Sequence, residues 1–463
     1  MTLRSRQIIP PIIFAALSLI AYANCLFDES RLPAAPGTDL EMQFISWREF
    51  GFGEMLRGNL PLWNPHIFGG TPYMASFQSA LFYPINWLHF FLPVSLAITW
   101  YCVVHTFLMG YFTSLWAGYR GISIRGQILA GVMAMFSGQY FLHAYAGHLP
   151  HLAVMVWAPL IFLCVDALAD GRSWKWLFLG SAAIAMQIFA GHPQYVFYGA
   201  LTIGLYALLR LFFSKHRIRL VAGVAAIYMI GALLSAIQLV PGLDATRENV
   251  RVGGLPYEMA AQFSTAPEQW VTALSPFVFG HLHEVIGQTG AADHFYIGYG
   301  YLWELCFFVS ITGFVLAIVG ILATSRANRV VCLILLAILV VISMGRFTPL
   351  HRLLYDYLPG FGSFRVPAKF MFFGTLIVAI LAAEGLDAVR SAASALHLRR
   401  AAIIAAEILA FFLIIEILLL AGDGLWSWEM QRLANAPERF NAYLFADPDF
   451  IAAALRIARY AIA

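Results

Sequence analysis

The sequence predicts an all-α polytopic membrane protein, and three observations support this fold class. Of the 463 residues, 61% are hydrophobic and only 11% are charged, whereas a soluble domain carries about a quarter charged residues. The apolar residues fall in repeated runs of roughly 18 to 25, close to the ~20 residues with which a helix crosses a bilayer. Polar and apolar residues do not alternate within these runs, as they would in the strands of a membrane barrel.

About eleven apolar runs have the length of a spanning helix. They are expected at 8–26, 93–117, 126–145, 150–167, 174–190, 195–213, 220–240, 298–323, 329–344, 368–388 and 401–421. Arg4 and Arg6 precede the first run, and Ala21-Tyr22-Ala23 resembles a leader cleavage site, so a cleaved signal is the alternative to an uncleaved first helix. We expect the uncleaved helix, because the run is long enough to span.

Basic residues between the runs predict the orientation. If the N-terminus is cytoplasmic, the cytoplasmic connections include Arg120, Arg125, Arg210, Lys215, Arg217 and Arg219. The short turns on the opposite side, at 146–149 and 191–194, contain no Lys or Arg, as the positive-inside rule requires. The net charge of +3 is small and scattered, which argues against nucleic-acid binding.

The remaining segments form the outer face in this topology. A transmembrane domain is expected over 1–421 with long outer loops at 27–92, 241–297 and 345–367, followed by an outer C-terminal segment at 422–463. Their Trp, Tyr, Pro and Gly content indicates structured loops that lie on the membrane. The five cysteines lie in or beside apolar runs without metal-like spacing, so they are interpreted as small core residues.

The first outer loop carries the strongest candidate for chemistry. Asp39 stands at the start of an amphipathic stretch that is predicted to form an interfacial helix, with the apolar residues Phe44, Trp47, Phe50 and Met55. One interpretation makes Asp39 a helix N-cap. The other makes it a partly desolvated general base, helped by Glu41 and Gln43.

The rest of this loop mixes aromatic, turn and amide residues. These lie at 62–65, 68–72 and 77–84, and the last segment contains Gln78. Such side chains can stack on a sugar ring and hydrogen-bond to its hydroxyl groups. An aromatic belt at the membrane surface, interrupted by turns, is the alternative interpretation.

Two outer turns repeat the same residues. Ala146-Gly147-His148-Leu149-Pro150 and Ala190-Gly191-His192-Pro193 each end one run and begin the next. Glycine suits the left-handed end of a helix, and proline is tolerated in the first turn of the following one. The histidines, with His143, His151 and Gln194 nearby, are either interfacial polar residues or a shared site for an anion or a metal. A divalent metal is kept open as a cofactor, but no spacing assigns its ligands.

Several cations lie near the outer interface. Arg247 and Arg251 follow the seventh run, and Arg346, Arg352, Arg365 and Lys369 flank the ninth and tenth. They either reach lipid headgroups or bind a phosphate through paired hydrogen bonds. The acids Glu304, Glu407 and Glu416 fall within apolar runs, and the sequence identifies no partner for them.

These motifs together resemble the YfhO-type bacterial membrane proteins, within the GT-C-fold glycosyltransferases that use polyprenyl-phosphate sugars. The resemblance covers about 37–388 in order. Its segments are 39–43, Gly69-Gly70-Thr71-Pro72 to Tyr83-Pro84, Gly147-His148, Ala190-Gly191-His192-Pro193-Gln194, and Gly345-Arg346-Phe347-Thr348-Pro349-Leu350 through Leu358-Pro359-Gly360-Phe361 to Phe364-Arg365-Val366-Pro367-Ala368-Lys369-Phe370.

The resemblance implies a GT-C-like fold and an inverting hexosyltransferase in the cytoplasmic membrane, with its active side facing the periplasm or exterior. Asp39 matches the catalytic carboxylate of such enzymes, and the implied partners are a polyprenyl-phosphate sugar, a cell-envelope glycopolymer or lipid acceptor, and membrane lipid. The implied substrate-binding residues are Glu41, Gln43, Gln78, His148, His192, Gln194, Arg247, Arg346 and Arg365.

The chain departs from that pattern in two places. Asp39-Leu40-Glu41 replaces the adjacent acidic pair of many GT-C enzymes, and the chain ends at Ala463 whereas YfhO-type proteins run longer. The segment 422–463 is therefore expected to be a truncated outer region.

Two other functions remain open: a transporter or flippase of lipid-linked saccharides, and an envelope assembly scaffold. A transporter would place polar or broken helices at the midplane, whereas here the polar groups gather on one face.

Overall fold

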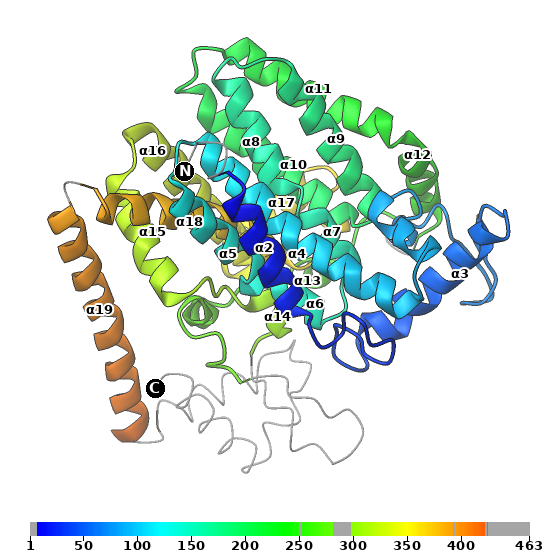
Figure 1. The fold of residues 1–463 in the computed structure, drawn as a ribbon, viewed down its shortest axis with the longest axis horizontal. Coiled ribbons are helices and arrows are strands. Elements are labelled where there is room, and N and C mark those ends of the chain that lie inside the picture. The colour runs from blue at the N-terminus through cyan, green and yellow to red at the C-terminus, as the bar shows by residue number, and fades with distance from the viewer. Residues whose placement is uncertain (1–6, 250–251, 281–297, 392–393, 422–423, 425–463) are drawn as a thin grey trace. The chain divides into compact units, whose positions relative to one another are not determined.

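The computed structural model describes residues 7–249, 252–280, 298–391, 394–421 and 424 (Figure 1). The described chain is mostly helical, with one two-stranded antiparallel hairpin in which Trp63 pairs with Pro72 and Asn64 with Thr71. Its predicted C-terminal segment, 422–463, lies outside the described residues except for Gly424.

The helices and strands have the following bounds. The N-terminal half contains α2 (Ile9–Ala21), π-helix η1 (Leu40–Phe44), α3 (Ile45–Leu56), β1 (Trp63–Asn64), β2 (Thr71–Pro72), η2 (Phe77–Ser79), η3 (Pro84–Phe90), α4 (Val94–Tyr119), α5 (Ile124–Met135), α6 (Gly138–Tyr145), α7 (Leu149–Met155), α8 (Ala158–Ala169), α9 (Lys175–Ala190), α10 (Pro193–Leu211), α11 (Arg217–Leu234), α12 (Ala236–Ala245) and η4 (Thr246–Glu248). The C-terminal half contains α13 (Tyr257–Ala260), η5 (Pro267–Ala273), α14 (Leu302–Leu305), α15 (Ile311–Ala323), α16 (Arg326–Ser343), η6 (Gly345–Phe347), α17 (Pro349–Tyr357), η7 (Phe361–Ser363), η8 (Pro367–Lys369), α18 (Phe370–Val389) and α19 (Ser394–Ala421).

Five helical segments in the described part of the chain are long and apolar enough to cross a membrane. They are Val94–Tyr119, Leu149–Ala169, Arg217–Leu234, Arg326–Ser343 and Pro367–Val389. Shorter apolar helices occupy Ile9–Ala21, Ile124–Met135, Lys175–Ala190 and Ile311–Ala323. The protein is therefore a helical, membrane-embedded protein, as its sequence predicts.

Four of the predicted runs are interrupted, one of them at 150–167, where α7 and α8 are separated at Val156 and Trp157. The run at 126–145 is two helices, α5 and α6, because the backbone leaves the helix after Met135 and the amide of Gly138 bonds to the carbonyl of Phe308 instead. The run at 298–323 contains α14 and α15, separated by extended backbone at Cys306. The run at 220–240 breaks at Ser235, between α11 and α12. Tertiary hydrogen bonds of this kind leave no hydropathy signal.

The chain divides into two compact units. Unit 1 comprises Met1–Met135, His143–Gly254 and Ser325–Leu336, and unit 2 comprises Phe136–Leu142, Leu255–Thr324 and Ala337–Ala463.

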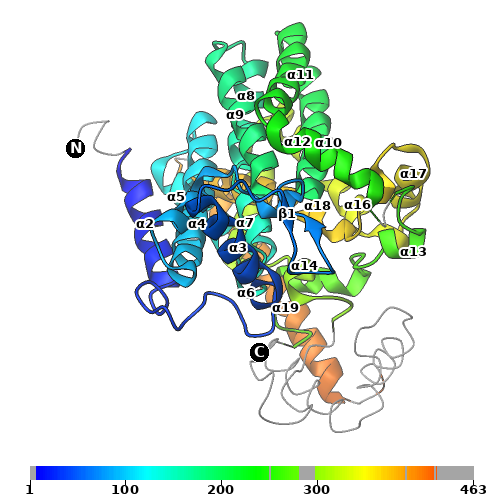
Figure 2. The same cartoon turned by 90° about the vertical axis from the view of Figure 1, so that its right-hand side faces the viewer.

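Unit 1 is a helical bundle that carries the first outer loop. In both views α8, α9 and α11 run side by side, and α2 packs on α4 and α5 (Figures 1 and 2). Trp116 of α4 is fully buried and stacks on Phe162 of α8, with ring centroids 4.8 Å apart. Close van der Waals packing of such rings helps to hold membrane helices together.

A buried charge network lies near the C-terminal end of α8. Asp166 accepts hydrogen bonds from Trp116 (2.9 Å) and Tyr206 (2.6 Å), and it pairs with Arg120 at 3.4 Å and Arg210 at 3.3 Å. A buried carboxylate with this many donors is fully compensated, so the network has a structural role. Sequence analysis missed Asp166, because one acid at the end of a long apolar run has no distinguishing pattern.

Unit 2 is organised around a close pair of helices, α15 and α18. Gly320 and Gly385 allow the contact, since a methyl group at either one would strike the backbone carbonyl of Leu381 or Leu316. Glu304 of α14, for which the sequence identified no partner, pairs with Lys369 at 3.4 Å, and both side chains are buried. Glu407 is exposed on α19, and the side chain of Glu416 lies outside the described residues.

Candidate functional site

The end of α6 brings two histidines together. Gly147 has a φ of +70°, and the amides of Gly147 and His148 bond to the carbonyls of Ala144 and His143. This is a Schellman motif, which places the side chains at the two ends of its longer hydrogen bond against each other. Those side chains are His143 and His148, whose Nδ1 atoms lie 2.9 Å apart. The sequence His-Ala-Tyr-Ala-Gly-His contains this signal, which sequence analysis did not use.

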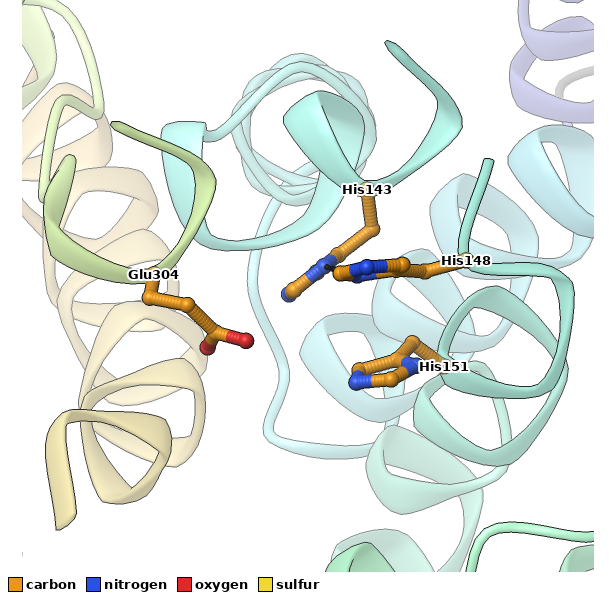
Figure 3. A group of neighbouring side chains, drawn as sticks. All are labelled: His143, His148, His151 and Glu304. Carbon is orange, nitrogen blue, oxygen red and sulfur yellow. Dashed lines mark hydrogen bonds between the residues drawn. The ribbon is translucent and has the colours of Figure 1, made fainter. Parts of the chain in front are cut away.

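Helical spacing adds a third imidazole. His148 precedes α7 and His151 follows three residues later, so both rings lie on one face of the first turn. Their centroids are 4.4 Å apart, and the rings of His143 and His151 are 4.7 Å apart. Figure 3 shows the three histidines gathered in this way, and it also draws Glu304, which belongs to unit 2.

The second repeated turn supplies the fourth histidine. Gly191 ends α9 with a φ of +91°, and Pro193 begins α10. His192 caps α10, because its Nδ1 accepts a hydrogen bond from the amide of Tyr195 at 3.3 Å. Its ring centroid lies 4.0 Å from that of His151. The two Ala-Gly-His turns therefore converge in space, as their repeated sequence suggested.

The first outer loop is docked on the same two turns. The amide of Ala35 bonds to the carbonyl of Tyr145 at 2.9 Å, and Thr38 lies against Gly147. A methyl group at Gly147 would come within 2.6 Å of the Leu40 backbone, and one at Gly191 would strike the carbonyl of Phe77. Glycine at both turns is thus what lets the loop approach the histidines.

This docking places Asp39 at the edge of the histidine cluster. Its carboxylate lies 3.4 Å from Nε2 of His148, and its side chain is 52% exposed whereas that of His148 is 11% exposed. Asp39 occupies the cap position of η1 but forms no capping hydrogen bond. Asp39 thus stands at the N-cap position without a capping bond from its side chain, and its carboxylate faces a histidine at the boundary between buried and exposed surface.

The amides of the loop are also brought together. Gln43 donates a hydrogen bond from its Nε2 to Oε1 of Gln78 at 2.8 Å. The segment that holds Gln78 is fixed by Arg48, whose Nη1 donates to the carbonyls of Gln78 (3.2 Å) and Ser79 (2.5 Å). Arg48 is fully buried, and burial lowers the pKa of its guanidinium, which nevertheless stays charged.

Arg48 corrects the predicted face of the interfacial helix. The buried residues of α3 and the turn before it are Phe44, Arg48, Gly51 and Phe52, whereas Trp47 and Phe50 are only partly covered. Hydrophobicity alone assigned Trp47 and Phe50 to the buried face of the helix. It could not assign Arg48 to that face, because an arginine is buried only where carbonyl groups bind it. Arg48 is thus a positioning residue that sequence analysis missed.

The other predicted site residues divide between the units. In unit 1, Gln194 is buried beside His192, and Glu41 accepts a hydrogen bond from the amide of Gly37 at 2.8 Å. Arg247, also in unit 1, is exposed and pairs with Asp244 at 3.3 Å.

The two remaining arginines belong to unit 2, where each bonds within that unit. Arg346 donates to the carbonyl of Glu258 at 3.3 Å, and Arg365 donates to Oε1 of Gln262 at 3.3 Å. Both therefore belong to a different unit from Asp39.

The cluster has the composition of a nitrogen-rich binding site with a carboxylate at its edge. One ring nitrogen from each of His143, His148 and His151 lies within 4.8 Å of the other two. Two kinds of chemistry fit this arrangement: proton transfer at Asp39, and metal binding by the imidazoles. Comparison of the sequence with protein-family models and with curated proteins gives no match, so the arrangement of the residues themselves carries the functional argument.

Proposed function

We propose that this chain is a GT-C-like glycosyltransferase of the YfhO type, with about eleven spans. In this proposal it lies in the cytoplasmic membrane with its N-terminus in the cytoplasm. It transfers a sugar from a polyprenyl-phosphate donor to a cell-envelope acceptor on the outer face. The observation that carries the proposal is the Asp39 carboxylate, which a docked outer loop holds half-exposed against His148.

Asp39 acts as the general base in the proposed reaction. The acceptor hydroxyl gives its proton to Asp39 as its oxygen attacks the anomeric carbon of the sugar. The bond from that carbon to the phosphate oxygen breaks, and polyprenyl phosphate leaves with the electron pair. Attack opposite the leaving group inverts the anomeric configuration. His148 orients the carboxylate, since Nε2 lies 3.4 Å from it.

The surrounding loop provides groups for recognition of the sugar. The paired amides of Gln43 and Gln78 present donors and acceptors of the kind that sugar hydroxyls bind. The loop also carries exposed aromatic rings, including Trp63 and Phe68, on which a sugar face can stack. Arg247 is exposed on unit 1 and is the cation proposed to meet the phosphate.

The test is transfer of labelled sugar from polyprenyl-phosphate donors in membranes that contain the full chain. Asp39→Asn keeps the shape of the side chain but removes the base, so transfer should fall by about 10²- to 10⁴-fold. Protein level and donor binding are measured in parallel and should not change.

Asp28→Asn is the matched control, because Asp28 lies on the same loop. Hydrogen bonds from Ser30 hold the pKa of Asp28 below its usual value, so this variant also removes one carboxylate charge. Its transfer rate should equal that of the wild type.

Transfer by Asp39→Asn at the wild-type rate would exclude Asp39 as the base. No transfer from any donor, combined with movement of lipid-linked sugar across vesicles, would identify a transporter instead, and neither activity would favour the scaffold.

A further inference from the structure

His143, His148 and His151 lie close together, and the proposed transfer reaction uses only His148 among them, to orient Asp39. His143 is fully buried, His151 is 7% exposed, and both belong to unit 1 with His148. The three residues come from segments that are fixed by backbone hydrogen bonds, through the Schellman turn and the first turn of α7. Their mutual placement is therefore set by the fold and does not depend on flexible side chains alone.

Each neutral imidazole carries one N–H group and one lone pair. The bond between the Nδ1 atoms of His143 and His148 uses one N–H group and one lone pair. One nitrogen of each of the three rings lies within 4.8 Å of the other two, and such a convergence of nitrogen donors suits a single cation.

We propose that His143, His148 and His151 bind one divalent transition-metal ion of the zinc class. Imidazole nitrogens favour Zn²⁺ and its neighbours, whereas Mg²⁺ and Ca²⁺ require oxygen ligands. Zinc–nitrogen bonds of about 2.0–2.1 Å place ligand atoms about 3.3 Å apart in a tetrahedron. In the structure one nitrogen of each ring lies within 4.8 Å of the other two, which is a wider limit than the spacing of bound ligands.

Asp39 supports the proposed site through His148. A carboxylate only accepts hydrogen bonds, so its contact with Nε2 at 3.4 Å favours the form of His148 that carries its proton on Nε2. The lone pair is then on Nδ1, the atom that faces His143. A carboxylate that orients a histidine in this way is the usual outer partner of a metal-binding imidazole.

Metal binding is tested with the purified full chain without a polyhistidine tag, in detergent or nanodiscs, and with the metal alone. After exposure to ZnCl₂ and dialysis, elemental analysis should find about one zinc per chain. Replacement by Co²⁺ should give the intense visible absorption of a tetrahedral nitrogen site, and excess Mg²⁺ should not displace it. Wild-type protein that retains no zinc and gives no such absorption would overturn the proposal.

Variants locate the ion. His143→Gln and His151→Gln should each lose the retained zinc, and Asp39→Asn should weaken binding by about 10- to 100-fold. His66→Gln is the matched control, because His66 is an exposed histidine of unit 1 outside the cluster, and it should bind as the wild type does. Zinc should also raise the Tm of the wild type and of His66→Gln but not of the cluster variants.

Equal zinc retention by the cluster variants would place the ion elsewhere and refute the proposal. The experiment needs neither donor nor acceptor, so its outcome is independent of the transfer assay. A chain that binds zinc without transferring sugar would refute the proposed function alone, and one that transfers sugar without binding zinc would refute the metal site alone.

Discussion

At the scale of single residues, buried histidines behave differently according to their neighbours. His351 of α17 is fully buried between the rings of Tyr257 and Phe361, with centroids 5.7 and 5.2 Å away. Within the described residues, neither of its ring nitrogens has a hydrogen-bond partner. Burial, with a smaller effect of Arg346, lowers the pKa of His351 to about 4. His351 therefore packs as a neutral side chain near pH 7 and becomes charged only in acid.

The lowered pKa of His351 predicts a loss of stability in acid. The unfolded residue binds a proton below about pH 6.5, whereas the folded one does so only near pH 4, so the folded state is disfavoured as pH falls through this range. The loss should approach about 3 kcal/mol at pH 4. Tm of purified protein, measured from pH 7.5 to 4, should fall less steeply in His351→Phe than in the wild type. Parallel curves would show that His351 does not control this acid sensitivity.

At the scale of elements, the two Ala-Gly-His turns are where the first loop meets the helices. Each turn ends a helix with a glycine at positive φ and begins the next helix near a proline. The glycines serve two purposes, because they adopt the left-handed conformation and also leave room for the loop backbone. We expect loss of that room to move Asp39 and Gln78 away from the histidines, so these turns connect the fold to the site.

The two purposes of glycine can be separated by comparing two alanine variants. Gly191 and Gly58 have φ values of +91° and +85°, but a methyl group at Gly191 would strike the carbonyl of Phe77, whereas one at Gly58 meets nothing within 4 Å. Gly58→Ala should therefore cost only the conformational strain, about 1 kcal/mol. Gly191→Ala should cost about 1–3 kcal/mol more, as a steric clash does. Chemical unfolding of both variants measures the difference, and equal costs would mean that the loop contact is not tight.

At the scale of the whole molecule, the two polar clusters of unit 1 occupy opposite ends of one membrane-length segment. His151 lies in the first turn of Leu149–Ala169 and Asp166 in its last turn, about 22 Å apart along a helix. The histidine end has no Lys or Arg in its turns, whereas the Asp166 end carries Arg120 and Arg210. This asymmetry is typical of a segment with its charged end in the cytoplasm.

Cysteine labelling tests that orientation. In a Cys25→Ser background, Asn59→Cys places a thiol in the first loop, and Ser173→Cys places one between α8 and α9, where both residues are exposed. The other native cysteines, Cys102, Cys164, Cys306 and Cys332, are buried. A membrane-impermeant maleimide should label Asn59→Cys in intact cells and Ser173→Cys only after permeabilisation. The reverse pattern would place the Asp39 loop in the cytoplasm and contradict the proposed function.

Hydropathy by itself determined that this is a helical membrane protein and located some of its long helices to within a few residues. The apolar run at 93–117, for example, corresponds to α4 at Val94–Tyr119. This is possible because membrane insertion depends on the composition and length of each segment, with little contribution from its neighbours. The repeated Ala-Gly-His turns were also visible, since glycine and proline mark helix ends locally.

Tertiary structure decided which polar residues meet. Only the fold placed His143 and His151 with His148, set Asp39 against that histidine, buried Arg48 under two carbonyls, and paired Asp166 with distant arginines. It also assigned Arg346 and Arg365 to a different unit from Asp39. The physical reason is that polar side chains in an apolar chain are positioned by partners far away in sequence, because a buried polar group must find its hydrogen bonds wherever the packing supplies them.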